Sequence, residues 1–340
     1  MKPRTMRNTW TPWLLLSLAL SLLLAVAATA DTPMPGGGKT VAPARATWTT
    51  GFFLEAIYSR ALKDLGYDVQ APKKLSNPIF YQALVNGDVD FWANGWFPLH
   101  NTQLPENFFD KAAIAGTVAQ GGALQGYLVS KPAVDQFGIK SLADFKRPEV
   151  KKAFDANGDG KADLVACPPG WGCEKAIAKH LEDYDLNDHI NPIKASYTAS
   201  MADALARFNN DEPVLFYTWT PNWTVYKLKP GEDVMWINVP DENAEEANGI
   251  PGAVTDPIRM GFPPNDIQVC ANKTFLKENP AAARLFEVMS IPLEDIALQN
   301  NRMNAGENTE KDVERHVTEW KALNQETWEG WLEEARKAAM

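Results

Sequence analysis

The chain has 340 residues, of which 45% are hydrophobic and 22% charged, with 43 Asp and Glu against 33 Lys and Arg. This length and hydrophobic content exclude a disulfide-stapled mini-domain and a disordered chain, and they predict about two domains of ordinary size. The net charge of -10 argues against a nucleic-acid partner. Twelve tryptophans and three cysteines are unusual enough to need an explanation.

The first thirty residues have the pattern of an export signal. A short basic start precedes an uncharged apolar run over 13–27, and small residues follow at 28–30. A membrane span needs about 20 apolar residues, so this run is short for one. We predict a signal peptide over 1–30 that is cut after Ala30 and a periplasmic mature protein. An uncleaved membrane anchor is the alternative.

Hydrophobic periodicity predicts helices and short strands in the first half of the mature chain. Expected helices cover 54–65 and 79–85, and expected strands include Val69, 89–93 and 125–130. The strand over 89–93 would place Trp96 at its far end. We expect a connector at Lys131 and Pro132.

The second half continues the same alternation, with a new unit starting near Ser141. Expected helices lie around 177–184, 201–208 and 280–289 and from Thr309 onward, and expected strands lie at 213–219, at 235–239 and around Val269. Helices alternating with strands predict an α/β fold. The predicted lobes are 31–135 with 256–340, and 136–255, with a ligand cleft between them.

Cys167 and Cys173 enclose a Pro-Pro-Gly-Trp-Gly loop. In an exported chain so close a pair predicts a structural disulfide, although a metal or redox role is the alternative. The bond would fix Trp171 on a rigid turn. A helix beginning directly afterwards would leave the backbone N–H groups near Gly172 and Cys173 free to bind a carboxylate. Cys270 is expected to be a buried free thiol.

Two other aromatic segments are candidates for the site. Trp96 lies four residues before His100, and an apolar strand ends at Trp219 shortly before Trp223. Each of these residues has an alternative structural role, the tryptophans in the core and His100 as a structural histidine. The remaining histidines, His180, His189 and His316, are expected on solvated helical faces.

An Asp/Gly-rich loop matches the first nine positions of an EF-hand calcium loop. Its candidate ligands are Asp155, Asn157, Asp159, Lys161 and Asp163. The twelfth position is Ala166, where a bidentate glutamate belongs. The loop is therefore either an incomplete structural calcium site or an ordinary Asp/Gly-rich turn.

Four motifs in order carry a resemblance to a known family. They are Gly-Trp-x-Pro-Leu-His, Asp-x-Asn-Gly-Asp-Gly-Lys-Ala-Asp, Cys-x-Pro-Gly-Trp-Gly-Cys-Glu and Tyr-Thr-Trp-Thr-Pro-x-Trp. This series resembles the periplasmic glycine betaine/proline betaine-binding proteins of ABC transporters, from about residue 40 to about 335. The resemblance implies a two-lobed, class II periplasmic-binding-protein fold that closes on its ligand.

The resemblance also implies which residues bind the ligand. Its quaternary ammonium box falls on Trp96, Trp171 and Trp219, and its carboxylate contacts fall on His100, Gly172 and Cys173. The sequence departs from the family pattern around 48–53, between Asp241 and Pro257, and at Cys270. These departures concern ligand preference.

The predicted function is therefore capture of glycine betaine or proline betaine for osmoprotectant uptake. The expected partner is an ABC permease with its ATPase subunits, and the expected state is a monomer that needs no cofactor and catalyses no reaction. Alternatives are a receptor for choline, carnitine or ectoine, an exported enzyme acting on quaternary amines, and a receptor that feeds a membrane sensor.

Overall fold

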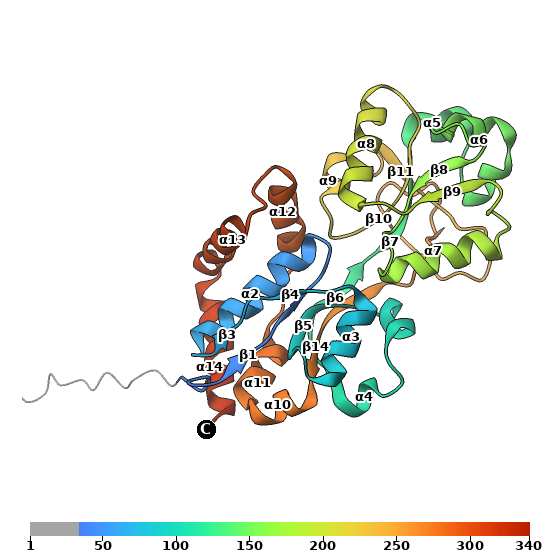
Figure 1. Ribbon diagram of the computed structural model, residues 1–340. Helices are drawn as coiled ribbons and strands as arrows, with labels where there is room; N and C mark the ends of the chain where they lie inside the picture. The colour runs from blue at the N-terminus through green and yellow to red at the C-terminus, as the bar shows by residue number, and fades with distance from the viewer. Residues whose placement is uncertain (1–33) are drawn as a thin grey trace, which may run out of the picture. The chain divides into compact units, whose positions relative to one another are not determined.

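The computed structural model describes residues 34–340 (Figure 1). The predicted signal peptide over 1–30 and the cut after Ala30 lie outside the described residues. No helix from residue 34 onward combines the length and the apolar character that a membrane crossing requires.

Two larger sheets organise the described residues. The first is antiparallel, in the order β5 (Phe91–Phe97), β14 (Asn265–Asn272) and β6 (Ala112–Ala123). The second has the order β11 (Val234–Ile237), β7 (Gln125–Ser130), β10 (Leu215–Trp219), β8 (Ala162–Val165) and β9 (Ile190–Ile193). In the second sheet β10, β8 and β9 are parallel, whereas β7 is antiparallel to both of its neighbours. Three short pairs also form: β1 (Thr40–Val41) with β3 (Asp68–Val69), β2 (Ala44–Arg45) with β4 (Lys73–Lys74), and β12 (Glu246–Ala247) with β13 (Ile258–Arg259).

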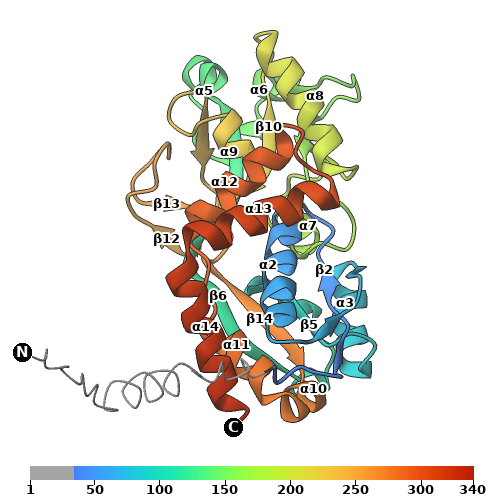
Figure 2. The same cartoon turned by 90° about the vertical axis from the view of Figure 1, so that its left-hand side faces the viewer.

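Each sheet has its own helices (Figures 1 and 2). Around the first lie α2 (Thr50–Asp64), α3 (Asn77–Asn86), α4 (Phe108–Lys111), α10 (Lys273–Glu278), α11 (Pro280–Val288), α12 (Leu293–Asn304), α13 (Glu310–Leu323) and α14 (Gln325–Ala338). Around the second lie α5 (Lys131–Phe137), α6 (Pro148–Phe154), α7 (Gly172–Asp183), α8 (Tyr197–Asn209) and α9 (Thr224–Lys227). Two 3-10 helices cover Leu99–Gln103 and Leu142–Lys146. The expected α/β fold is confirmed.

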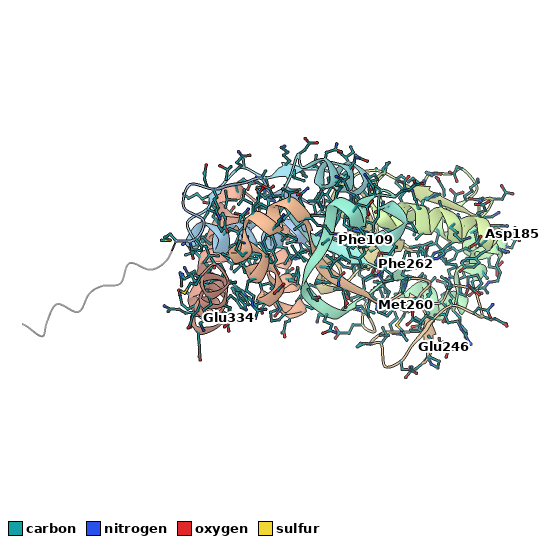
Figure 3. All side chains as sticks on the ribbon, turned by 90° about the horizontal axis from the view of Figure 1, so that it is seen from below. Phe109, Asp185, Glu246, Met260, Phe262 and Glu334 are labelled. Carbon is teal, nitrogen blue, oxygen red and sulfur yellow. A yellow bond between two sulfur atoms is a disulfide. The ribbon has the colours of Figure 1, made fainter. Side chains whose placement is uncertain are left out.

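The chain crosses between the sheets twice. It leaves the first sheet after Ala123 and enters the second at Gln125, and it returns between Arg259 and Asn265. Figure 3 shows Met260 on the return crossing. The lobe limits expected at 135 and 255 stay predictions, and the change of sheet comes before the first of them.

Most predicted elements are present, including the helix near 54–65 and the strand over 125–130. The connector expected at Lys131 and Pro132 is wrong, because these residues begin α5. Proline fits there because the first-turn N–H that it lacks has no intrahelical partner. The helix expected from Thr309 onward is present as α13, and a capping box of Thr309 and Asp312 begins it.

Strand β6 was not predicted, and its sequence explains why. It is rich in Ala and Gly and lacks the alternation of a half-buried strand. At Gly116 a Cβ would lie 1.8 Å from the carbonyl oxygen of Phe286 on α11. The small residue lets the backbone of α11 pack directly on the strand. Such close packing requires small residues, so the alternation of apolar and polar residues that would reveal a strand is absent.

Candidate functional site

A small cavity lies between elements of the two sheets. One side is lined by the first group of elements, those of the first sheet and the segments around it, namely by Trp48, Trp96, Leu99 and His100. The other side is lined by the second group of elements, those of the second sheet and the segments around it, namely by Gln125, Trp171, Gly172, Cys173, Tyr217 and Trp219. All six positions expected to contact a ligand therefore surround one cavity.

The indole rings stand at steep angles to one another. The centroids of Trp171 and Trp219 are 5.5 Å apart with an interplanar angle of 81°. Those of Trp48 and Trp171 are 5.4 Å apart at 65°. Rings in several orientations around one space offer π faces from different directions, an arrangement that suits a cation without N–H groups.

Asn94 on β5 orients two of these rings from behind. Its side-chain oxygen accepts hydrogen bonds from Trp48 Nε1 at 3.1 Å and from Trp96 Nε1 at 2.8 Å. Asn94 is itself buried. One amide thus fixes two walls of the cavity through their indole N–H groups.

The predicted disulfide is confirmed, because Cys167 and Cys173 are bonded. The bond closes the turn that presents Trp171, immediately before α7 begins at Gly172. Trp171 Nε1 also donates to Thr47 Oγ1 at 2.8 Å, so this ring joins elements of the two sheets. Gly172 and Cys173, the first two residues of α7, line the cavity, and N–H groups at the very start of a helix generally lack an intrahelical partner.

His100 is buried within a hydrogen-bonded setting. Its Nδ1 accepts the backbone N–H of Trp96 at 3.2 Å and lies 2.8 Å from the Tyr81 hydroxyl. The backbone donor at Nδ1 leaves the proton of the neutral ring on Nε2. The Nε2 edge lies beside Gly172, where a Cβ would come within 3.1 Å of Nε2, and 3.0 Å from the side-chain amide of Asn77. Burial lowers the pKa of His100 to about 3, so the ring is a neutral donor.

The expectation that His180 and His316 lie on solvated faces is wrong, because both are buried. His180 Nδ1 lies 2.8 Å from the Tyr127 hydroxyl, and its ring packs on Phe262. Burial lowers the pKa of His180 to about 4. The polar neighbours of His180 in the sequence suggested exposure, whereas its contacts with Tyr127 and Phe262 come from distant segments that the fold brings together.

These buried histidines predict a loss of stability in acid. The unfolded chain protonates them below about pH 6.5, whereas the folded state keeps His100 and His180 neutral down to pKa values of about 3 and about 4. The free energy of unfolding is therefore highest above about pH 6.5 and falls as the pH falls. At pH 5 it is lower by about 2 kcal/mol for each of the two histidines. Urea unfolding at pH 7 and pH 5 measures the loss. His180→Gln should reduce it by about 2 kcal/mol, and an unchanged loss in that variant would contradict the assignment.

Sequence reasoning missed several lining residues, above all Trp48, Gln125 and Tyr217. Tyr217 lies two residues before Trp219 on β10, so strand periodicity places both on one face and offered a usable signal. Trp48 appeared only as a departure from the family pattern. Gln125 lies opposite Trp219 in the register of β7 and β10, which the sequence does not reveal.

Trp223 does not line this cavity but connects the two sides elsewhere. Its backbone N–H donates to Asn300 Oδ1 at 2.8 Å, and Asn300 Nδ2 donates to Thr49 Oγ1 at 2.8 Å. Asn300 on α12 is fully buried. This contact and the one between Trp171 and Thr47 hold the two groups of elements together on one side of the cavity.

The candidate calcium loop is held by backbone hydrogen bonds. The Asp155 carboxylate accepts from the N–H groups of Gly158, Asp159 and Gly160, and Asp163 accepts from Ala156 and Asn157. Lys161 Nζ donates to the carbonyl of Asn187. Over residues 34–340, no three His, Cys, Asp or Glu side chains gather to hold a metal ion. Calcium at this loop stays a prediction.

Comparison with known proteins gives consistent matches over most of the chain. The family described as the substrate binding domain of ABC-type glycine betaine transport system (OpuAC) matches residues 39–322. The glycine betaine-binding periplasmic protein OusX of Dickeya dadantii is 39% identical over 324 residues, which are 95% of this chain and 98% of that one. The glycine betaine/proline betaine-binding periplasmic protein of Escherichia coli is 40% identical over 311 residues, which are 90% of this chain and 92% of that one.

Solved structures agree on the fold. Lactococcal OpuAC, in its closed-liganded conformation complexed with glycine betaine, has a TM-score of 0.66 at 21% identity, covering 86% of this chain and 99% of that chain. An ABC-transporter choline binding protein in complex with choline has a TM-score of 0.70 at 20% identity, covering 88% and 96%. The expected two-lobed periplasmic-binding-protein fold is confirmed.

Proposed function

The chain belongs to the family of substrate-binding domains of ABC-type glycine betaine transport systems, and from that premise we propose that it captures glycine betaine or proline betaine and delivers it to an ABC importer. One observation carries this proposal: Trp96, Trp171 and Trp219 line the same cavity as His100 and the start of α7. The protein would act in the periplasm after removal of residues 1–30, as a monomer that presents its ligand to the permease and its ATPase subunits.

The two ends of a betaine match the two kinds of wall. A trimethylammonium group has no N–H to donate, so aromatic faces are its natural partners, at ~2 kcal/mol or more for a desolvated contact. The carboxylate needs donors, and His100 Nε2–H with the N–H groups of Gly172 and Cys173 would provide them. Because the rings come from both sides of the cavity, ligand binding would favour closure.

Hydrogen-bond donors placed to bind the ligand's carboxylate favour a zwitterion over choline, which has no carboxylate. The lining residues also support a binding function without covalent chemistry. Cys173 is held in the disulfide, and burial keeps His100 neutral by lowering its pKa to about 3. Neither an activated nucleophile nor a poised general base is present among the residues that line the cavity.

Titration calorimetry of the mature protein with glycine betaine tests this function. We expect saturable binding with one site, which choline displaces only at much higher concentration. A folded protein that gives no heat with glycine betaine up to the millimolar range would refute the proposal. Stronger binding of choline, carnitine or ectoine would reassign the ligand while keeping the receptor class.

A further inference from the structure

Gln125 is a buried amide in the wall of the cavity. It is the first residue of β7, at the point where the chain enters the second sheet, and only 2% of it is exposed. It lies opposite Trp219 in the register of β7 and β10 and lines the same cavity. Neither the motifs nor the family resemblance assigned it a role.

The orientation of this amide is set by Tyr217. The Tyr217 hydroxyl donates to Gln125 Oε1 at 2.5 Å. Burial raises the pKa of Tyr217 well above its ordinary value, so the hydroxyl keeps its proton and remains a donor. The amide oxygen is therefore occupied, and the amide nitrogen is left for another partner.

That nitrogen has no hydrogen-bond partner among residues 34–340, although it is buried. A buried donor without an acceptor is unfavourable, and native proteins keep such groups mainly where a ligand or water completes them. Trp219 Nε1, on the neighbouring strand, is buried and without a partner as well. Two unused N–H donors in the wall of one cavity call for an acceptor on the ligand.

We propose that the side-chain amide of Gln125 donates a hydrogen bond to the carboxylate of the bound zwitterion and thereby selects against quaternary amines that lack a carboxylate. This inference rests on the proposed function. An N–H dipole gains nothing from a trimethylammonium group, whereas a carboxylate oxygen satisfies it with a charge-assisted bond. With choline bound, the only acceptor would be a neutral hydroxyl, which gives a weaker hydrogen bond than a carboxylate does.

The test compares glycine betaine and choline binding by calorimetry in four proteins: the parent, Gln125→Met, Tyr217→Phe and the double variant. Gln125→Met keeps the shape and removes the donor, so we expect about 10- to 100-fold weaker betaine binding. Choline affinity should change by less than about threefold. Gln299→Met is the matched control, because Gln299 is buried on α12 away from the cavity lining, and it should bind betaine like the parent.

The double variant separates a ligand contact from a structural role. It leaves neither a tyrosine hydroxyl nor a glutamine oxygen without its partner, yet it still lacks the donor, so the loss of betaine affinity should persist. Recovery of parent affinity in the double variant would overturn the inference, and so would an equal loss for betaine and choline or an unchanged Gln125→Met. If the parent protein itself fails to bind betaine, the proposed function fails first.

Discussion

Replacing Trp171 with alanine is expected to abolish measurable glycine betaine binding while the chain stays folded. The ring lines the cavity, faces Trp48 and Trp219 at centroid distances of 5.4 and 5.5 Å, and bonds Thr47 from the opposite group of elements. Its removal would delete both an aromatic face for the cation and the hydrogen bond to Thr47 that favours closure. We expect at least about a 100-fold loss of affinity, measured by calorimetry.

Two further variants make this result interpretable. Trp171→Phe keeps a smaller aromatic face and loses the bond to Thr47, so its affinity should fall between those of the parent and the alanine variant. Trp320→Ala is the matched control, because Trp320 packs against Trp328 and Trp331 near the C-terminus and does not line the cavity. Betaine binding of Trp171→Ala within tenfold of the parent, or an equal loss in Trp320→Ala, would contradict the role of the ring.

The sequence predicted this wall because its signal is local. Trp171 is enclosed by two cysteines six positions apart, Trp96 is the penultimate residue of β5, and Trp219 is the last residue of β10. Such features can be recognised in the sequence without knowledge of the fold. The order of the motifs then indicated that they act together, which no single motif could do.

The parts that the sequence did not predict depend on contacts between distant segments. Trp48 becomes a wall only because Asn94 holds its indole, 46 positions away. Gln125 becomes a lining residue through strand register with Trp219. His180 is buried by Tyr127 and Phe262 despite polar neighbours in the sequence. In each case tertiary packing decided the environment.

Gly172→Ala is expected to weaken betaine binding strongly by adding a single carbon. A Cβ at Gly172 would lie 2.8 Å from Cδ2 and 3.1 Å from Nε2 of His100, and 3.0 Å from Cδ2 of Leu99. The His100 ring is buried and fixed by Trp96 and Tyr81, so it cannot easily move away. The added carbon would separate the start of α7 from His100 and disturb the donors proposed for the carboxylate.

We expect about a 10- to 100-fold loss of betaine affinity in this variant, because one or two charge-assisted hydrogen bonds would be weakened. Gly330→Ala on α14 is the matched control, since a Cβ there meets no atom within 4 Å, and it should bind like the parent. If Gly172→Ala also binds like the parent, the carboxylate does not lie between His100 and α7. A selective loss of betaine over choline would instead place the carboxylate there, because the trimethylammonium group is common to both ligands and only the carboxylate distinguishes them.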